Sequence, residues 1–449
     1  MGASALSANT TGVENTSVGY QALKDNTTGQ QNVAIGRLAL LSSTTGNFNI
    51  AIGSAALDAN TTASNNVGIG AAALGANTTG DRGVAVGSSA LAANTTGTEN
   101  TALGYLAMDA NTTGAANTAV GSGALGANTT ANYNVAVGVN ALTACTTGAN
   151  NVAIGVFALD GLTTVSETTA VGYKSLSAAV TGVRNQAFGT EAMLLTTSGA
   201  DNSAVGKSAL QNNTSGSYGT GIGNYACKSN TTGDHNTGLG YYALYNNQTG
   251  ANNVALGGTA GSDLTTGSAN TFMGYGTQPS ANNGEYQIVA GYATHGHGDS
   301  KFTFGTGSGF SRVYNSFTVN ASWTRVSDER YKENITPNAD CGLAFINDLN
   351  PVTYTWKALS NIDKDLPDYD EKALEPKHKE KMYGLIAQEV KTALDKNNIT
   401  DFGGWDVEEN TGIQSISQEM FIHPLIKAVQ ELSDKLEAAE KRIKDLENG

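Results

Sequence analysis

A serine and a lysine that could cut a peptide bond stand close together in the run Ser327–Ile335. The hydroxyl of Ser327 can reach the carbonyl carbon of Val326 through a five-membered ring. Attack would move the acyl group from nitrogen to oxygen, and water would then hydrolyse the ester. A neutral amine with a lowered pKa, such as Lys332, must take the hydroxyl proton. The alternative is that Ser327 and Asp328 begin a helix as an N-cap while Lys332 is solvated, and these residues alone favour it.

His295 and His297 have the only spacing in the chain that suits a metal ion. Residues i and i+2 of a strand point the same way, so three copies around an axis would supply six imidazole ligands in octahedral geometry. The alternative, which we favour, is that these histidines belong to a polar loop without a metal ion. We expect no other cofactor. The three cysteines form no disulfide framework, and we expect structural roles for them: Cys227 stands where most repeats have Leu, and Cys145 where most have Asn.

Most of the chain consists of a repeat, and the segments that could carry chemistry come after it. One glycine returns every 17 residues from Gly2 to Gly274 without insertion or deletion. A fixed period of this length is typical of stacked, identical turns, each covering its neighbour. A catalytic pocket needs irregular loops, so we predict a β-solenoid shaft over residues 1–275 and no enzyme within it.

Each turn follows the consensus G-x-x-A-L-x-x-N-T-T-G-x-x-N-x-A-V. Segments such as Asn32–Gly36 alternate like short strands, and Asn-Thr-Thr-Gly is typical of a turn, since Asn and Gly tolerate positive φ. We expect the apolar residues before each glycine and the leucines four residues after it to form one thin core. The asparagines of the Asn15 and Asn32 column can form amide ladders. Narrow turns should also leave an apolar stripe exposed, which predicts three chains around an axis.

Aromatic residues replace the repeat over residues 276–326, where we predict a compact β junction or tip. Alternation over Lys301–Phe304 and Ser316–Val319 indicates short strands. Exposed aromatic residues here could contact sugars, although packing in a trimer is the favoured interpretation.

Composition excludes several classes of protein. Only 14% of residues are charged and the formal net charge is −14, without a basic patch, which argues against nucleic-acid binding. No apolar run is long enough for a membrane span, and the start lacks the features of a secretory signal. We therefore expect synthesis in a cytoplasm without a signal peptide, and an N-terminal attachment module beyond the repeats given.

The last part of the chain predicts a long helix. Its apolar residues alternate by three and four from Ile422 to Leu446, an a/d heptad track flanked by Lys and Glu. This pattern favours a coiled coil over about 417–447, the alternative being a surface helix of a single chain. Pro424 lies near the start, where a helix tolerates it.

Three segments of the C-terminal part occur in a recognisable order: Ser327–Ile335, Leu349–Trp356 and Tyr383–Val390. They resemble the intramolecular chaperone domain of phage endosialidases, tail fibres and tailspikes over residues 327–449. The resemblance implies a trimer-forming α+β domain that cuts itself off at the Val326–Ser327 bond. It also implies that Ser327 and Lys332 form a catalytic Ser-Lys dyad. Asp328 and Arg330 match the motif too, and we expect supporting structural roles for them.

Two weaker resemblances concern the rest of the chain. The repeats resemble the β-roll heads of trimeric autotransporter adhesins, which use a similar Asn-x-Ala-Ile-Gly unit. The pair His295 and His297 is similar to the repeated Gly-x-His-x-His motif with which long tail fibres of T-even phages hold iron, but it occurs here once and without the leading Gly-x.

Together these features predict a mainly β, homotrimeric tail fibre with a structural or host-recognition role. Its chaperone domain would act once, as a serine peptidase in cis, and we expect no enzyme that turns over a substrate. The fibre would be part of a virion or extracellular, and its partner would be a host surface glycan or protein receptor, with no nucleic acid and no membrane insertion. The first alternative is a bacterial trimeric surface adhesin with the same chaperone, and the second is a glycan-degrading tailspike.

Overall fold

The computed structural model describes residues 2–179, 181–307, 312–317, 324–325, 333–364, 366, 369–376, 379–407 and 412–448. The chain divides into two compact units, Met1–Tyr331 and Lys332–Gly449. The first unit is a β-solenoid of 17-residue turns that ends in longer strands. The second is a small β/α region that ends in a long helix. Each unit is described by itself.

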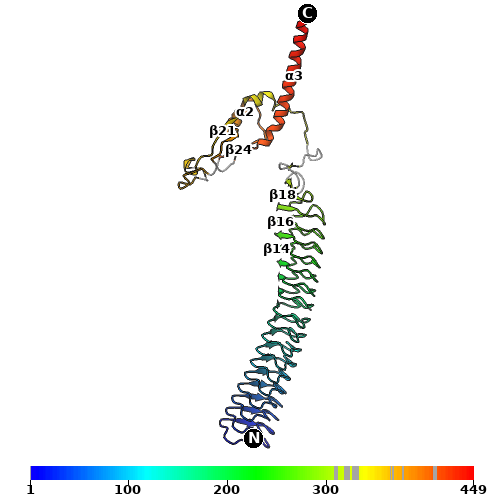
Figure 1. Ribbon diagram of the computed structural model, residues 1–449, viewed down its shortest axis with the longest axis vertical. Helices are drawn as coiled ribbons and strands as arrows, with labels where there is room; N and C mark the ends of the chain where they lie inside the picture. Colours follow the sequence, from blue (N-terminus) through cyan, green and yellow to red (C-terminus); the bar gives the residue numbers. More distant parts are fainter. Residues whose placement is uncertain are drawn as a thin grey trace. The chain divides into compact units, whose positions relative to one another are not determined.

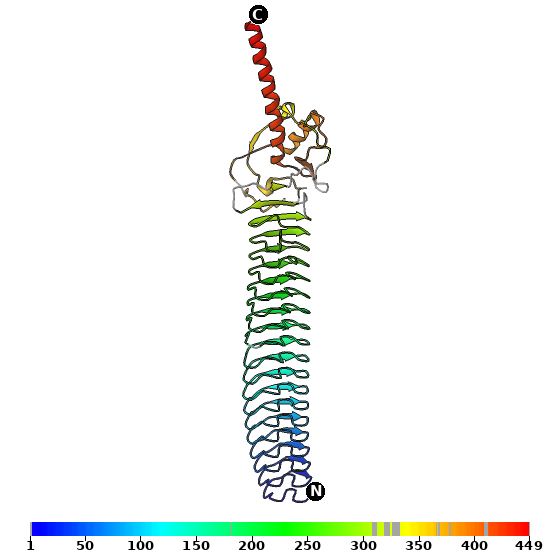
Figure 2. The same ribbon diagram turned by 90° about the vertical axis from the view of Figure 1, so that its right-hand side faces the viewer.

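The solenoid contains sixteen strands of three residues, one in each turn (Figure 1). Each strand pairs in parallel and in register with the next, so that Val33 lies beside Ile50 and Ile50 beside Val67 (Figure 2). The strands are β1 (Thr16–Val18), β2 (Val33–Ile35), β3 (Ile50–Ile52), β4 (Val67–Ile69), β5 (Val84–Val86), β6 (Thr101–Leu103), β7 (Thr118–Val120), β8 (Val135–Val137), β9 (Val152–Ile154), β10 (Thr169–Val171), β11 (Gln186–Phe188), β12 (Ser203–Val205), β13 (Thr220–Ile222), β14 (Thr237–Leu239), β15 (Val254–Leu256) and β16 (Thr271–Met273).

The end of the solenoid is built differently. Strand β17 (Ile288–Tyr292) still follows β16 at the 17-residue spacing, with Met273 beside Ala290. Strand β18 (Lys301–Thr306) also pairs in parallel, but Ile288 lies beside Phe302, so this step is shorter. The chain then reverses into β19 (Arg312–Ser316) and β20 (Thr324–Arg325), which pair antiparallel. The predicted strand over Lys301–Phe304 is confirmed. The second predicted strand, Ser316–Val319, overlaps the observed strand β19 only at Ser316. Residues 318 and 319 are outside the described part.

The core of the solenoid is made of small side chains. The middle residue of each strand is buried, and most of them, such as Ala34, are fully buried, as are Ala-Leu pairs such as Ala22 and Leu23. The prediction that the residues before each glycine join this core is wrong: Ile35 is 38% exposed and Leu103 47%. In a three-residue strand only the central side chain points inward, so both its neighbours lie on the outer face of the sheet.

The 17-residue glycine repeat has two physical causes. Each glycine after a strand has a positive φ between 116° and 144° from Gly19 to Gly274, a region in which residues with a Cβ are strained. The turns are also too close for a side chain, since a Cβ on Gly104 would lie 2.5 Å from the carbonyl oxygen of Gly121. Glycine is therefore required at every turn.

Positive φ occurs outside the Asn-Thr-Thr-Gly segment. Asn26 and Gly29 tolerate a positive φ, but neither adopts one. The left-handed residues are instead those two, four and twelve places after the glycine, such as Gln21 (54°), Leu23 (51°) and Gln31 (56°). Their amide groups bond to the adjacent turns, with the amide of Leu23 2.9 Å from the carbonyl of Ala39. Hydrogen bonds between turns therefore hold the bends.

Two ladders of buried asparagines run along the solenoid. In the predicted ladder the Oδ1 atom of Asn15 accepts from the backbone amide of Asn32 at 2.9 Å, and Asn32 Nδ2 donates to the carbonyl of Gly46 at 2.9 Å. In a second ladder Asn111 Nδ2 donates to Asn94 Oδ1 at 2.7 Å, so the first Asn of Asn-Thr-Thr-Gly is a ladder residue. Buried amides with partners on both sides satisfy polar groups that a thin core would otherwise leave unpaired.

One turn keeps its core filled by exchanging the positions of large and small residues. Gly261 stands where other turns have leucine, and the next strand has Phe272 where others have alanine. A Cβ on Gly261 would lie 2.6 Å from the Phe272 ring, so the ring occupies the space of the missing leucine. Phe272 is fully buried.

The described residues of the second unit form three α-helices and two antiparallel strand pairs. They are α1 (Leu343–Asp348), β21 (Val352–Tyr354), β22 (Met382–Gly384), α2 (Ala387–Lys396), β23 (Trp405–Val407), β24 (Gln414–Ile416) and α3 (Ile422–Glu447), with short 3-10 turns η3 (Leu359–Asn361) and η4 (Gln418–Phe421). Its core centres on Phe345 of α1, fully buried, with Phe402 and Phe421 at ring-centroid distances of 5.6 and 6.2 Å. Val390 and Leu394 of α2 close the core.

Candidate functional site

The residues predicted to perform the cleavage chemistry are outside the described part of the chain. This holds for Val326, Ser327, Asp328, Arg330 and Lys332. Their roles therefore remain predictions, and the candidate site is built from the two other motif segments and from α3.

Those two motif segments meet in one strand pair. Strands β21 and β22 are antiparallel, with Val352 beside Gly384 and Tyr354 beside Met382. Helix α2 begins at Ala387, directly after β22. The side chain of Asn350, just before β21, donates to Glu389 of α2 at 3.1 Å. Segments that are 28 or more residues apart in sequence thus form a single structural piece.

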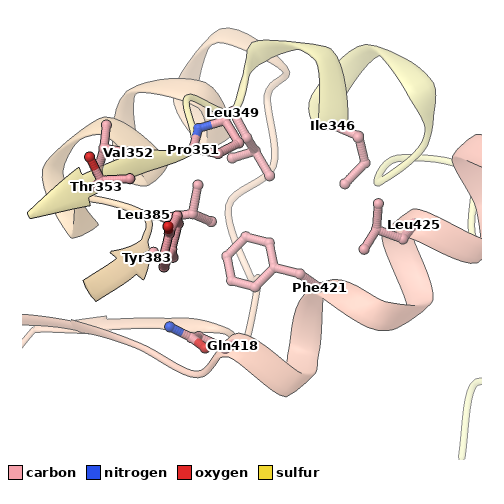
Figure 3. Close-up of a pocket in the computed structure, with 11 residues that line it drawn as sticks. Ile346, Leu349, Pro351, Val352, Thr353, Tyr383, Leu385, Gln418, Phe421 and Leu425 are labelled. Atoms are coloured by element: carbon pink, nitrogen blue, oxygen red, sulfur yellow. The ribbon is translucent and has the colours of Figure 1, made fainter. Parts of the chain in front are cut away.

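A mostly apolar groove of about 460 Å³ lies between this strand pair and the beginning of α3. Figure 3 shows Phe421 at its centre, with Leu385 and Tyr383 on the strand side and Ile346 and Leu425 on the helix side. Tyr383 is 73% exposed and Leu425 is 48% exposed. The polar side chains that line it are those of Thr353, Tyr383 and Gln418.

The first half of α3 is fixed to α1 by a carboxylate. Glu431 Oε2 accepts a hydrogen bond from the backbone amide of Leu343 at 2.9 Å, at the N-terminal end of α1. A carboxylate there satisfies an amide that the helix itself leaves unpaired. Lys427 Nζ lies 3.8 Å from Glu431 Oε1, one helical turn away. The buried residues of α3 are Pro424 and Ala428, both in its first half, where the helix lies against α1.

The opposite stripe of α3 is apolar and exposed. All the large a/d residues of the predicted heptad track are at least 48% exposed, namely Ile422, Leu425, Val429, Leu432, Leu436, Ile443 and Leu446. The predicted helix is confirmed, and its apolar stripe has no partner within the described part of its own chain. An amphipathic helix with a bare apolar stripe needs another surface to cover it.

An ion pair joins the ends of α1 and α2. Lys396 Nζ lies 2.6 Å from Asp348 Oδ1, and Asn397 Nδ2 lies 2.9 Å from Oδ2. These hydrogen bonds, Lys396 first, lower the pKa of Asp348. The pair is at the surface and has a structural role.

The two histidines of the predicted metal site differ in their surroundings. His295 is exposed, whereas the ring of His297 stacks on Tyr314 with centroids 3.8 Å apart. Burial, followed by the charges of Arg312 and Lys301, lowers the pKa of His297. A neutral imidazole suits a metal ligand, but two neighbouring cations oppose a bound metal ion. Within the described residues no three His, Cys, Asp or Glu side chains gather as a metal site.

Two cysteines are core residues of the solenoid. Cys145 replaces an asparagine of the second ladder and is fully buried, and burial raises the pKa of its thiol to about 11. Cys227 replaces a leucine, is fully buried too, and has a pKa raised by burial to about 12. Both stay as thiols at neutral pH, and together with Cys341 they are free.

Comparison with known proteins identifies part of the second unit. Residues 327–399 match the Peptidase_S74 family, described as chaperone of endosialidase. The match includes α1, β21, β22 and α2 and ends before α3. The chain therefore combines an N-terminal β-solenoid with a C-terminal domain of the endosialidase chaperone type. Neither the curated proteins nor the solved structures that were compared include a significant match. In the described part of the chain no helix has the length and apolar character of a membrane span.

Two features of the site were missed from the sequence. The groove around Phe421 depends on β22 lying beside β21, and no local pattern predicts that contact. The cap of α1 by Glu431 joins residues 88 positions apart. Alternation over Val352–Tyr354 was the one local signal, since it marks β21 as a strand.

Proposed function

We propose that the chain is a trimeric tail-fibre protein of a phage or phage-like particle. In this proposal the C-terminal domain assembles three chains and then removes itself by cleavage at Val326–Ser327. The observation that carries the proposal is the occurrence in one chain of two bare apolar surfaces, on the solenoid sheet and on α3, beside a domain of the endosialidase chaperone type. The cleaved fibre would be exposed on the particle, where it can meet a host surface.

The outer face of the solenoid sheet supports an association between copies. The first and third residues of strands β1–β16 point outward and include no Asp, Glu, Lys, Arg or His. Many of them are large and apolar, such as Ile52 (37% exposed) and Leu239 (45%). Adjacent columns do carry charges, for instance Arg37 and Lys207 directly after their glycines. An uncharged face along the whole solenoid is typical of a surface covered by other copies.

The chaperone would solve a kinetic problem. Parallel pairing of long, repetitive surfaces needs the correct register before it returns free energy, and a slip by one turn costs little in a uniform repeat. A coiled coil of α3 would bring three chains together at one fixed register. The shafts could then assemble from that end, and cleavage would leave the fibre kinetically trapped.

The cleavage step would use Ser327 and Lys332. The Ser327 hydroxyl attacks the Val326 carbonyl carbon while neutral Lys332 takes its proton, and the C–N bond breaks as the amide nitrogen receives a proton. Water then hydrolyses the resulting ester, which regenerates the serine hydroxyl and leaves a Val326 carboxylate. The net reaction consumes one water molecule and needs no cofactor.

Intact mass spectrometry of the freshly expressed protein tests this proposal. We expect wild type to give two fragments separated at Val326–Ser327, and Ser327→Ala to give only the full-length mass. Lys332→Ala should behave like Ser327→Ala, whereas Lys357→Ala, in the same domain, should cleave like wild type. A single full-length mass for wild type would mean that the domain only assembles the chains, and the dyad would be withdrawn.

A further inference from the structure

Four tyrosine rings gather on the surface of two adjacent turns of the solenoid. Tyr225 lies 5.0 Å from Tyr242, Tyr242 lies 4.3 Å from Tyr241, and Tyr242 lies 4.4 Å from Tyr245, all between ring centroids. Tyr241 is 56% exposed, and the other three rings are half-buried. The hydrogen bond with Tyr241 raises the pKa of Tyr242, so its phenol stays protonated. The rings form a continuous aromatic surface with hydroxyl groups.

Two lysines lie over this aromatic surface. The Lys228 Nζ atom is 5.4 Å from the centroid of Tyr225 and 5.6 Å from that of Tyr245. Lys207 Nζ lies 5.8 Å from the centroid of Tyr225. Cation–π contacts at these distances hold both ammonium groups beside the rings without neutralising them. The patch therefore offers positive charge on a chain whose net charge is −14.

Packing of the solenoid does not account for these residues. At the position of Tyr242, other turns have Ala55, Ala72 or Ser89, and at the position of Tyr245 they have Asp58 or Asp109. The turns stack in the same register with either set. Charged residues in these columns also place them outside the uncharged sheet face. We expect the patch to stay open to solvent when copies associate through that face.

We propose that Tyr225, Tyr241, Tyr242 and Tyr245, with Lys207 and Lys228, form a binding site for a carboxylate-bearing glycan. Aromatic rings present a flat apolar surface to the C–H face of a sugar ring, and tyrosine hydroxyls can bond to its hydroxyl groups. The two ammonium groups would pair with the sugar carboxylate by charge-assisted hydrogen bonds. Tyrosines held by one another lose little conformational entropy on binding. This inference rests on the host-recognition part of the proposed function and adds the place and the ligand class.

A panel of immobilised glycans, carboxylate-bearing and neutral, tests the site with the full-length protein. We expect binding to at least one carboxylate-bearing glycan. Tyr242→Ala and Lys228→Gln should each weaken it tenfold or more, as removal of a central contact does. The matched control is Tyr105→Ala, a 59% exposed tyrosine that follows its own glycine as Tyr241 does, and it should bind like wild type. Raising the salt concentration should weaken binding.

Several outcomes would overturn the site: no binding of any carboxylate-bearing glycan, binding of neutral glycans or of an immobilised oligonucleotide alone, or binding unchanged in both variants. Oligomeric state and cleavage are measured on the same samples. A trimeric, cleaved protein that fails to bind contradicts only the glycan site. A monomeric, uncleaved protein contradicts the proposed function instead.

Discussion

At the scale of single residues, backbone conformation rather than side-chain chemistry explains the repeat. The glycine after each strand has a φ that only glycine adopts without strain, and its neighbour in the next turn leaves no room for a Cβ. The leucine four places later is held in the left-handed region by its bond to the next turn, as at Leu23. None of the leucine-position variants Met108, Met193 and Cys227 is β-branched, which suits that conformation.

Substitution of one such glycine should therefore destabilise the solenoid. For Gly104→Ala we expect a lower urea midpoint, because left-handed strain costs about 1–3 kcal/mol and the new Cβ would lie 2.5 Å from the Gly121 carbonyl oxygen. The control is Gly75→Ala, which has no positive φ and whose column holds alanine at Ala92. Faster hydrogen exchange should be confined to turns near Gly104, since a solenoid turn contacts only its neighbours. Equal midpoints for the two variants would contradict this explanation.

At the scale of elements, α3 has two faces with different tasks. Glu431 and the buried Ala428 hold its first half to α1, whereas the a/d stripe is bare. The stripe continues to Leu446, beyond the contact with α1, so this part of the helix gains nothing from its own domain. Helices in proteins gain most of their stability from packing of an apolar face, and a coiled coil would supply the missing burial.

We expect Leu436→Asp to abolish or strongly weaken trimer formation, with at least a tenfold loss of association, because it would place carboxylates within the coiled-coil seam. Leu436 is 59% exposed in the single chain, so the fold of the domain itself should change little. Light scattering after size-exclusion chromatography measures the oligomeric state. Ala438→Asp places the same charge off the stripe and should stay trimeric. An unaffected Leu436→Asp protein would mean that α3 is a surface helix.

At the scale of the whole molecule, two independent surfaces point to association of identical chains. The α3 stripe is short and repeats every seven residues, whereas the sheet face is long and repeats every 17. The α3 stripe is suited to aligning the chains quickly in one register, and the sheet face is suited to a large, stable interface. Because the side chains of the sheet face differ little from turn to turn, that face cannot set the register by itself.

A lysine on the sheet face distinguishes a covered surface from an open one. In an isolated chain Leu239→Lys should cost less than about 0.5 kcal/mol, because Leu239 is 45% exposed. In a trimer it would bury three like charges, so we expect loss of the assembled shaft or a markedly lower melting temperature. Thr232→Lys, at an exposed turn, is the matched control. Identical melting curves and oligomeric states for the two variants would exclude this face as the interface.

The sequence by itself determined the features that repeat or that depend on neighbours in the chain. Gly19, Gly36 and their equivalents predict the stacked turns, Asn15 and Asn32 predict a ladder, and the heptad track predicts α3. These inferences succeed because a uniform stack brings each residue opposite its own equivalent, so periodicity alone defines the contacts.

Only the tertiary structure decided the features that depend on direction or on distant contacts. It places Ile35 outside the core, because a three-residue strand can bury one side chain only. It pairs β21 with β22 and brings Phe345, Phe402 and Phe421 together, contacts for which no local pattern exists. It also places Lys228 Nζ over the ring of Tyr225 in its own turn, a contact that the bends of the turn decide.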